Sequence, residues 1–228
     1  MAFYKDTRNI YRVSELDRLA WLEHGFGTRA SGAWVAGNLV TLRQVHSDTC
    51  VWVDRAGGPV IKGDALVSNT PRLFLGVRTA DCLPIFIVDE RLRAIAAVHA
   101  GWRGAAARIS AKAVETLAAR FSSHPQDLLA AIGPGICAAC YRVGPEVAQR
   151  FLAWLPELSG LAGETGLDLL AANRRQLVEA GIPPGRIFAG APCTFCHPDQ
   201  FHSHRRDSQK AGRMLSAIGV KDEFSLAG

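Results

Sequence analysis

The interval between two apolar runs near the middle of the chain limits the fold more than any other sequence feature. Leu73–Arg78 and Pro84–Val88 are apolar and of strand length, and only a short polar stretch that begins at Thr79 separates them. A parallel pair of strands needs a crossover of a dozen residues or more, usually a helix. The interval is too short for that, so it predicts that the two runs pair as antiparallel strands.

The order of the other predicted elements favours an α+β fold, because strands and helices do not alternate regularly. We expect two short strands within Leu39–Val53, a strand at Ala94–His99, a helix from Gly104 to Phe121 and a buried strand at Leu128–Ile132. Later segments predict two helices, a short strand and a last apolar segment, near Pro145–Trp154, Asp168–Ala180, Arg186–Gly190 and Gly212–Val220. The 228 residues contain no repeat, low-complexity tract or linker, so we expect residues 1–228 to form a single domain.

Composition argues against membrane and nucleic-acid partners. The longest stretch without Asp, Glu, Lys or Arg runs from Leu128 to Tyr141, whereas a membrane helix needs about 20 apolar residues. The N-terminal segment is charged throughout and lacks the apolar region of a secretory signal, so we expect a cytoplasmic protein. The net charge is +5, but the basic residues are scattered and do not form the stripe typical of nucleic-acid binders.

Three short segments each carry one potential metal ligand at the predicted end of a strand. They are RQVHSD with His46, TADCLP with Cys82 and VHAGWRG with His99. Two imidazoles and one thiolate suit a tetrahedral zinc ion, and three protein ligands leave a fourth position for water or substrate. Taken singly, each residue is more simply interpreted as a buried core side chain. The intervals between them match no standard ligand spacing.

Together with IGPGICAACYRVG at Ile132–Gly144 and FHSHRRD at Phe201–Asp207, these segments resemble one family. It is the peptidoglycan-editing-factor or laccase-domain family, whose members carry the names polyphenol oxidase and purine nucleoside phosphorylase. The resemblance extends from HGFGTR at His24–Arg29 to Gly212–Met214. It implies a four-layer α/β/β/α sandwich with mixed sheets. It also implies a catalytic zinc on the residues that match His46, Cys82 and His99.

The resemblance implies phosphorolysis of purine nucleosides, namely adenosine, inosine and methylthioadenosine, with a linked adenosine deaminase activity. Three alternatives stay open: a copper-dependent polyphenol oxidase, a hydrolase that edits peptidoglycan precursors, and a zinc-stabilised interaction protein. A single centre of two histidines and one cysteine cannot assemble a multicopper cluster, which argues against the oxidase. The sequence does not indicate an oligomeric state.

Adjacent arginines in the FHSHRRD segment are candidates for binding the attacking phosphate. Arg205 and Arg206 lie between aromatic, histidine and aspartate residues, and the guanidinium fork matches phosphate oxygens. Arg29, in the HGFGTR segment, is predicted to join them. The simpler interpretation is a solvated pair of charges.

The chain departs from the family pattern in two places. Only Ala30–Arg43 fills a gap that is usually longer, so we expect a shortened substrate-enclosing loop and a more open site. Arg142 occupies a position that commonly carries glutamate.

The remaining cysteines and histidines receive simpler interpretations. Cys137-x2-Cys140 and Cys193-x2-Cys196 have the spacing of a structural zinc knuckle. The family does not require them, so we expect free buried thiols that behave as small hydrophobic side chains. A second zinc is the alternative. We expect His24, His124 and His197 to be surface or loop residues.

Overall fold

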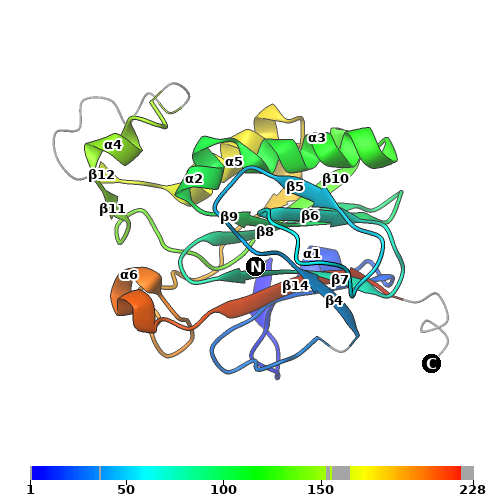
Figure 1. The fold of residues 1–228 in the computed structure, drawn as a ribbon, viewed down its shortest axis with the longest axis horizontal. Helices are drawn as coiled ribbons and strands as arrows, with labels where there is room; N and C mark the ends of the chain where they lie inside the picture. The colour runs from blue at the N-terminus through cyan, green and yellow to red at the C-terminus, as the bar shows by residue number, and fades with distance from the viewer. Residues whose placement is uncertain (1, 36, 153–154, 156–164, 222–228) are drawn as a thin grey trace.

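Two six-stranded sheets pack face to face in the computed structural model, which describes residues 2–35, 37–152, 155 and 165–221 (Figure 1). The first sheet contains, in spatial order, β1 (Phe3–Lys5), β2 (Tyr11–Val13), β3 (Leu22–Phe26), β14 (Met214–Val220), β7 (Leu73–Thr79) and β4 (Asn38–Thr41). The second contains β13 (Ile187–Phe188), β10 (Leu128–Ile132), β8 (Leu83–Asp89), β9 (Ala94–Ala100), β6 (Ala65–Ser68) and β5 (Cys50–Trp52). Each sheet has parallel and antiparallel pairs, so both are mixed.

The prediction that Leu73–Arg78 and Pro84–Val88 pair with each other is wrong. They form β7 and β8, which lie in different sheets, and residues 80–82 carry the chain from one sheet to the other. β7 pairs with β14, and β8 pairs with β9 in the register Leu83 opposite Ala100. The short interval excluded a crossover helix. It could not distinguish a hairpin from a corner between sheets, since both connections need only a few residues.

Three helices cover the outer face of the second sheet: α2 (Trp102–Ala106), α3 (Ile109–Phe121) and α5 (Leu169–Glu179) (Figure 1). The single helix expected from Gly104 to Phe121 is divided, because Arg108 adopts a left-handed conformation with φ 63° between α2 and α3. The side chain of Asp168 caps α5 by accepting the Ala171 N–H at 2.8 Å. None of the described helices is long and apolar enough to cross a membrane.

The remaining elements are short. They are the helices α1 (Ser14–Asp17), α4 (Pro145–Ala148) and α6 (His204–Asp207), the paired strands β11 (Arg142–Val143) and β12 (Thr165–Gly166), and the 3-10 turns Pro125–Asp127, Pro184–Arg186 and Ser208–Lys210. Part of the helix expected near Pro145–Trp154 lies outside the described residues.

Strand β8 shows why the second sheet lies at the centre of the molecule. Its Ile85 and Ile87 face the core under the helices, while Phe86 and Val88 face the core between the sheets. Phe86 stacks on Phe26 of the first sheet, with ring centroids 4.4 Å apart. A strand buried on both faces produces a continuous apolar run. The α+β class with mixed sheets is confirmed, and among the described residues the two longest helices lie on the same side of the sheet pair.

His24 lies in the middle of β3, not at the surface, so the prediction for this residue is wrong. It stands opposite Ile218 of β14, and none of its surface is exposed. Its Nε2 accepts the backbone N–H of Val13 at 2.9 Å. His124 is exposed, as expected, and His197 lies half-buried in a loop.

Candidate active site

His46, Cys82 and His99 converge at one end of the sheet pair. One ligand atom from each lies within 4.8 Å of the other two, and the two imidazole rings meet edge to face with centroids 4.9 Å apart. In a tetrahedral zinc site with ligands at about 2.0–2.3 Å, the ligand atoms lie about 3.4–3.8 Å from one another. The three side chains therefore need only a small inward movement to hold a metal ion.

The topology explains why His46 and Cys82 meet. β4 and β7 are parallel neighbours in the first sheet, so both end at the same edge. From there each chain segment passes to the second sheet, one through residues 42–49 into β5 and the other through residues 80–82 into β8. His46 and Cys82 lie on these two corners, and His99 comes from the end of β9 beside them.

The backbone around the centre is constrained. His46 and Asp81 adopt left-handed backbone conformations, with φ 59° and 86°, which residues other than glycine rarely adopt. Gly101 provides room on the other side, because a Cβ there would lie 2.9 Å from the Cys82 Sγ. The backbone is therefore strained at two residues next to the three ligands, and a glycine without a Cβ leaves room for the Cys82 sulfur.

The buried carboxylate of Asp64 orients two of the three ligands. Its Oδ1 lies 2.8 Å from His99 Nδ1 and accepts the His46 backbone N–H at 3.0 Å. Its Oδ2 accepts the backbone N–H and the hydroxyl of Ser47 at 2.6 and 2.7 Å. With Nδ1 bonded to Asp64, the Nε2 of His99 is the ring nitrogen left for a metal. Carboxylates that hold a ligating imidazole in this way are a recurrent feature of metal sites.

These contacts shift the pKa values of Cys82, His99 and Asp64. Burial would raise the pKa of the Cys82 thiol, but hydrogen bonds with His46 and His99 outweigh it and lower that pKa to about 6. Burial would lower the pKa of His99, but the bonds to Asp64 and Cys82 raise it to about 9. The same network holds the pKa of Asp64 well below its usual range, against the effect of burial. The centre therefore contains a thiolate, which is the form of cysteine that binds metals.

Asp81, the neighbour of Cys82, anchors the loop that closes one side of the site. Its Oδ1 accepts the Thr194 hydroxyl at 2.7 Å. Its Oδ2 accepts the Ser203 hydroxyl at 3.1 Å and the Arg205 backbone N–H at 2.7 Å. A second buried carboxylate thus ties the segment from Thr194 to Arg205 to the corner that carries a ligand.

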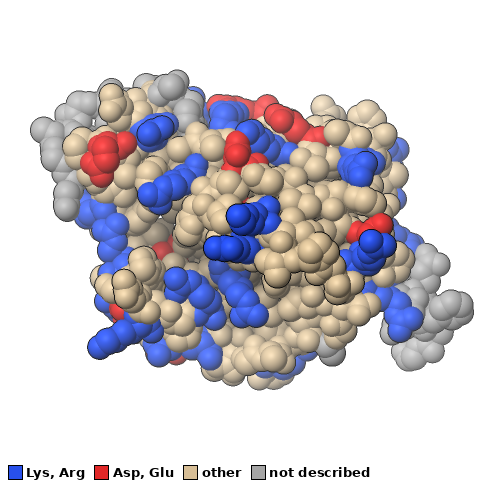
Figure 2. All heavy atoms as spheres, in the orientation of Figure 1, with Lys and Arg blue, Asp and Glu red and all other residues tan. Residues whose placement is uncertain are grey.

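Three adjoining cavities form a groove over the centre. The first, of about 400 Å³, is lined by the three ligands together with Gln44, Arg78, Ala80, His204 and Arg213. The second, of about 360 Å³, shares His46, Cys82 and His204 with it and adds Trp102, Arg103, Tyr141 and Arg205 among others. The third, of about 330 Å³, shares Arg78 and Arg213 with the first. Basic side chains flank the hollow on the face drawn in Figure 2.

The short segment Ala30–Arg43 forms part of this groove. Its residues Ser31, Gly32, Ala33, Val35 and Leu39 line the third cavity beside Arg29. The segment that was expected to be shortened therefore provides one wall of the groove.

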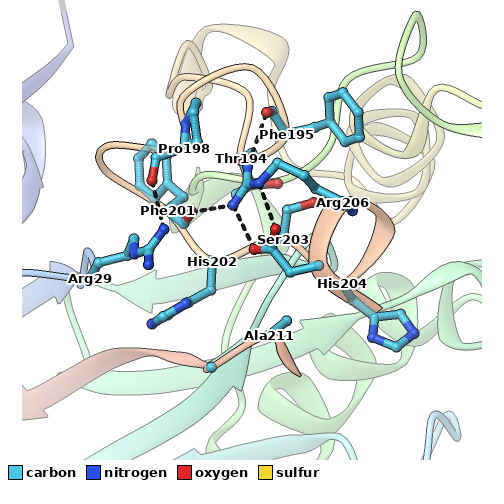
Figure 3. Close-up of polar contacts among 12 residues, drawn as sticks. Arg29, Thr194, Phe195, Pro198, Phe201, His202, Ser203, His204, Arg206 and Ala211 are labelled. Atoms are coloured by element: carbon cyan, nitrogen blue, oxygen red, sulfur yellow. Dashed lines mark hydrogen bonds and ion pairs between the residues drawn. The ribbon is translucent and has the colours of Figure 1, made fainter. Parts of the chain in front are cut away.

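The three arginines predicted to bind phosphate occupy different positions. Arg205 lines the second cavity, donates to the Arg142 carbonyl at 2.7 Å and lies 5.0 Å from the Tyr141 ring centre. Arg29 lines the third cavity and donates to the Pro198 carbonyl at 2.8 Å (Figure 3). The structure therefore does not bring Arg29 and Arg205 into one cavity.

Arg206 lines none of these three cavities, and its guanidinium lies within the loop before it (Figure 3). Its guanidinium donates to the carbonyls of Thr194, Phe195 and Phe201 at 2.9–3.0 Å and twice to the Asp207 carboxylate at 2.9 Å. These bonds use all five N–H donors of the side chain. In this arrangement Arg206 holds the loop in shape.

Several residues of the site did not stand out in the sequence. Asp64 and Asp81 orient the ligands and the loop, and Arg78, Arg213 and Tyr141 line the groove. Asp81 was inside the TADCLP segment, so its neighbour Cys82 was a signal for it. Tyr141 and Arg213 likewise lay inside segments that carry the family resemblance, whereas nothing in the sequence marked Asp64 or Arg78.

The four paired cysteines form no disulfide, as expected, but the expectation that they are buried is wrong. Cys196 is exposed and Cys137, Cys140 and Cys193 are half-buried. One sulfur from each lies within 4.8 Å of the other three, so they form a second cluster that could hold a metal ion.

Comparison with known proteins matches residues 27–221 to the family described as multi-copper polyphenol oxidoreductase laccase. A purine nucleoside phosphorylase of Deinococcus radiodurans is 37% identical over 84% of this chain and 74% of its own length. Adenosine deaminase RL5, from an unknown prokaryotic organism, is 39% identical over 79% of this chain and 74% of its own length. The crystal structure of YlmD from Geobacillus stearothermophilus superposes with a TM-score of 0.87 and 29% identity, covering 97% of this chain and 99% of that one.

Proposed function

The chain belongs to the multi-copper polyphenol oxidoreductase laccase family, and from that premise we propose that it is a zinc-dependent purine nucleoside phosphorylase. The proposed substrates are adenosine, inosine and methylthioadenosine together with phosphate, and deamination of adenosine is a linked activity. One observation carries the proposal: His46, Cys82 and His99 converge beneath a groove lined with arginines. The names of the two relatives support it, since one is a purine nucleoside phosphorylase and the other an adenosine deaminase.

The donor set favours zinc over copper. Two imidazoles and one thiolate fit zinc with one open position. The clusters of potential ligands found in the described residues are this set and the four cysteines. Neither contains the additional histidines that a multicopper cluster needs, which argues against phenol oxidation. When bound, zinc would stabilise negative charge on the departing base, or lower the pKa of water for deamination.

Phosphorolysis forms a bond between a phosphate oxygen and C1′ of the sugar and breaks the bond from C1′ to the purine nitrogen. The hydrogen phosphate dianion gives up its proton, the base leaves with one proton, and a sugar 1-phosphate dianion remains. The reaction requires a positioned phosphate dianion and stabilisation of an oxocarbenium-like sugar. Arginines of the groove meet the first requirement. Asp64 and Asp81 act indirectly, by orienting the ligands and the loop that carries Arg205.

Arg205 and Arg29 are alternative phosphate-binding residues along the groove, and Arg206 has a supporting role. Arg205 lines the second cavity and Arg29 the third, and each donates one hydrogen bond to a backbone carbonyl. A charge-assisted contact contributes about 1.5–3 kcal/mol. Removing the arginine that binds phosphate, by Arg205→Ala or Arg29→Ala, should therefore raise the KM for phosphate roughly tenfold or more without loss of zinc. Arg206→Ala should mainly lower the melting temperature. If Arg206→Ala is as stable as the wild type and has a raised KM for phosphate, Arg206 binds phosphate directly and the supporting role is wrong.

The decisive experiment measures product formation by the zinc-loaded protein on each nucleoside, with and without phosphate. Phosphate-dependent release of free base and sugar 1-phosphate is expected, and phosphate-independent release of ammonia from adenosine would demonstrate the linked activity. Cys82→Ser should lose both, while Cys50→Ser, which alters a cysteine outside both ligand clusters, should keep them. Turnover of phenols by the copper-loaded protein with no action on nucleosides would overturn the proposal in favour of the oxidase.

A further inference from the structure

We propose that Cys137, Cys140, Cys193 and Cys196 bind a second metal ion, a structural zinc that fastens two loops beside the active site. This site is separate from the His46, Cys82 and His99 centre and does not depend on the proposed activity. The four residues form two Cys-x2-Cys pairs, one after β10 and the other before α6.

The four sulfurs lie close enough together to share one metal ion. All lie within 4.8 Å of one another, and the Cys140 and Cys196 sulfurs are 3.4 Å apart. Zinc–sulfur bonds of about 2.3 Å place the sulfurs of a four-cysteine site about 3.8 Å from one another. The fold therefore brings two pairs from distant parts of the sequence close to the spacing that a four-thiolate zinc site requires.

The backbone around the pairs supports a ligand role. The Cys137 N–H donates to the Cys193 sulfur at 3.3 Å, and a hydrogen bond of this kind stabilises a thiolate. Residues Gly135 and Cys193 form an isolated parallel bridge, with the Thr194 N–H bonded to the Gly135 carbonyl at 3.1 Å. The two loops are thus already aligned next to the sulfurs.

The cluster lies at the edge of the core and reaches the surface. Cys140 and Cys193 pack against the core under the helices, as Cys50 does, whereas Cys196 is exposed and Cys137 is half-buried. A buried packing role therefore does not account for all four thiols. Four adjacent accessible thiols in an unligated state would be open to oxidation.

The loop that carries the second pair has little regular structure of its own. Residues 189–203 contain no named helix or strand, and loops longer than about 12–15 residues without regular structure are uncommon in compact domains. A bound metal supplies folding free energy where regular hydrogen bonding is absent. The proposed zinc would join this loop to the segment after β10.

Both loops reach the active site directly after a cysteine. Tyr141 follows Cys140 and lines the second cavity, where it stacks with Arg205. Thr194 follows Cys193 and bonds to Asp81, the neighbour of Cys82. The second zinc would therefore hold one wall of the groove in place, without touching substrate.

Metal analysis of the purified full chain tests the proposal. We expect two zinc ions per chain in the wild type, one in Cys82→Ser, one in Cys196→Ser and none in the double variant. Cys50→Ser is the matched control, since it removes a cysteine outside both clusters and should retain two. Cobalt substitution of Cys82→Ser should show strong thiolate-to-cobalt charge-transfer absorption from the remaining site.

Two results would overturn the proposal. One is a wild-type protein with a single zinc that Cys82→Ser removes completely. The other is a Cys140–Cys196 disulfide in protein purified without oxidant, detected as a mass two hydrogens lower than that of the reduced chain. If Cys196→Ser fails to fold, the wild-type metal content, the mass and the cobalt spectrum of Cys82→Ser still decide.

Discussion

Two buried histidines, one in each sheet, have surroundings that shift the imidazole pKa in opposite directions. His24 of β3 has none of its surface exposed, and burial together with the nearby Arg12 charge lowers its pKa to about 4. His99 of β9 is 3% exposed, yet its hydrogen bonds to Asp64 and Cys82 outweigh burial and raise its pKa to about 9. Depth within the molecule is nearly equal at the two sites.

The difference between them lies in the partner of each imidazole. His24 accepts a backbone N–H through Nε2, which requires a neutral ring, and so it serves as a structural acceptor in the core. His99 faces a buried carboxylate on one side and a thiolate on the other, which orients the ring for metal binding. Burial destabilises the charged form of an imidazole, and hydrogen bonds to neighbouring groups determine whether the pKa falls or rises. Four predictions test this comparison.

The largest effect is expected at the His99 site, on removal of the thiolate. Cys82→Ser should lose one equivalent of zinc and at least about 100-fold in activity, because loss of a ligand exceeds the 10–100-fold cost of altering an outer partner. His24→Gln is the control and should keep its full zinc content. Elemental analysis and steady-state kinetics of both variants measure this. Unchanged zinc in Cys82→Ser would remove Cys82 from the ligand set.

The next effect concerns stability in acid. The pKa of His24 is lower in the folded protein than the ordinary value of 6.5, so the unfolded chain binds its proton more readily. The resulting stabilisation is complete above pH 6.5 and should disappear as the pH falls to 4, at a cost of about 3 kcal/mol. Urea unfolding at several pH values measures it.

His24→Gln keeps a hydrogen-bond acceptor but cannot titrate in this range, so it serves as the matched variant. Its free energy of unfolding should vary less between pH 6.5 and 4 than that of the wild type. Identical pH dependence in the two proteins would show that another group causes the loss of stability.

A smaller effect is expected from the carboxylate partner of His99. Asp64→Asn retains the size of the side chain but removes the charge that orients and polarises the imidazole. Metal affinity should fall about 10–100-fold. Competition with a chelator of known affinity measures it. Asp17→Asn, which removes the carboxylate nearest His24, should leave metal affinity unchanged, and a loss of equal size there would indicate a non-specific effect of charge.

The smallest effect is expected in the titration of His24 itself. Asp17 Oδ1 lies 3.9 Å from His24 Nδ1, and its negative charge raises the pKa of His24 against the effect of burial. Asp17→Asn should therefore lower that pKa further, as followed by NMR of the imidazole protons. Tyr4→Phe removes the hydrogen bond from Tyr4 to Asp17 but keeps the carboxylate charge, so it should shift the pKa less. A rise of the His24 pKa in Asp17→Asn would contradict the assigned electrostatics.

Local pattern was sufficient for several features of the fold. The strands β8, β9 and β10 and the helix α5 were predicted close to their observed bounds, as was the end of α3, because apolar runs and periodicity reflect burial directly. The family resemblance identified the three residues that meet at the candidate centre. The pairing of β7 with β8, the surface position for His24 and the burial of the four paired cysteines were predicted wrongly, because each depends on which segments lie next to one another.

The sequence by itself determined the elements and the set of chemically capable side chains, since both depend on residue type and short-range spacing. The tertiary structure alone decided that the corners after β4 and β7 meet, because this depends on strand pairing between distant segments. It likewise decided that Asp64 faces His99, that Arg206 bonds to its own loop and that two Cys-x2-Cys pairs join. Charge and reactivity follow from such neighbours. The same imidazole is therefore a neutral acceptor at His24 and an oriented, charge-paired group at His99.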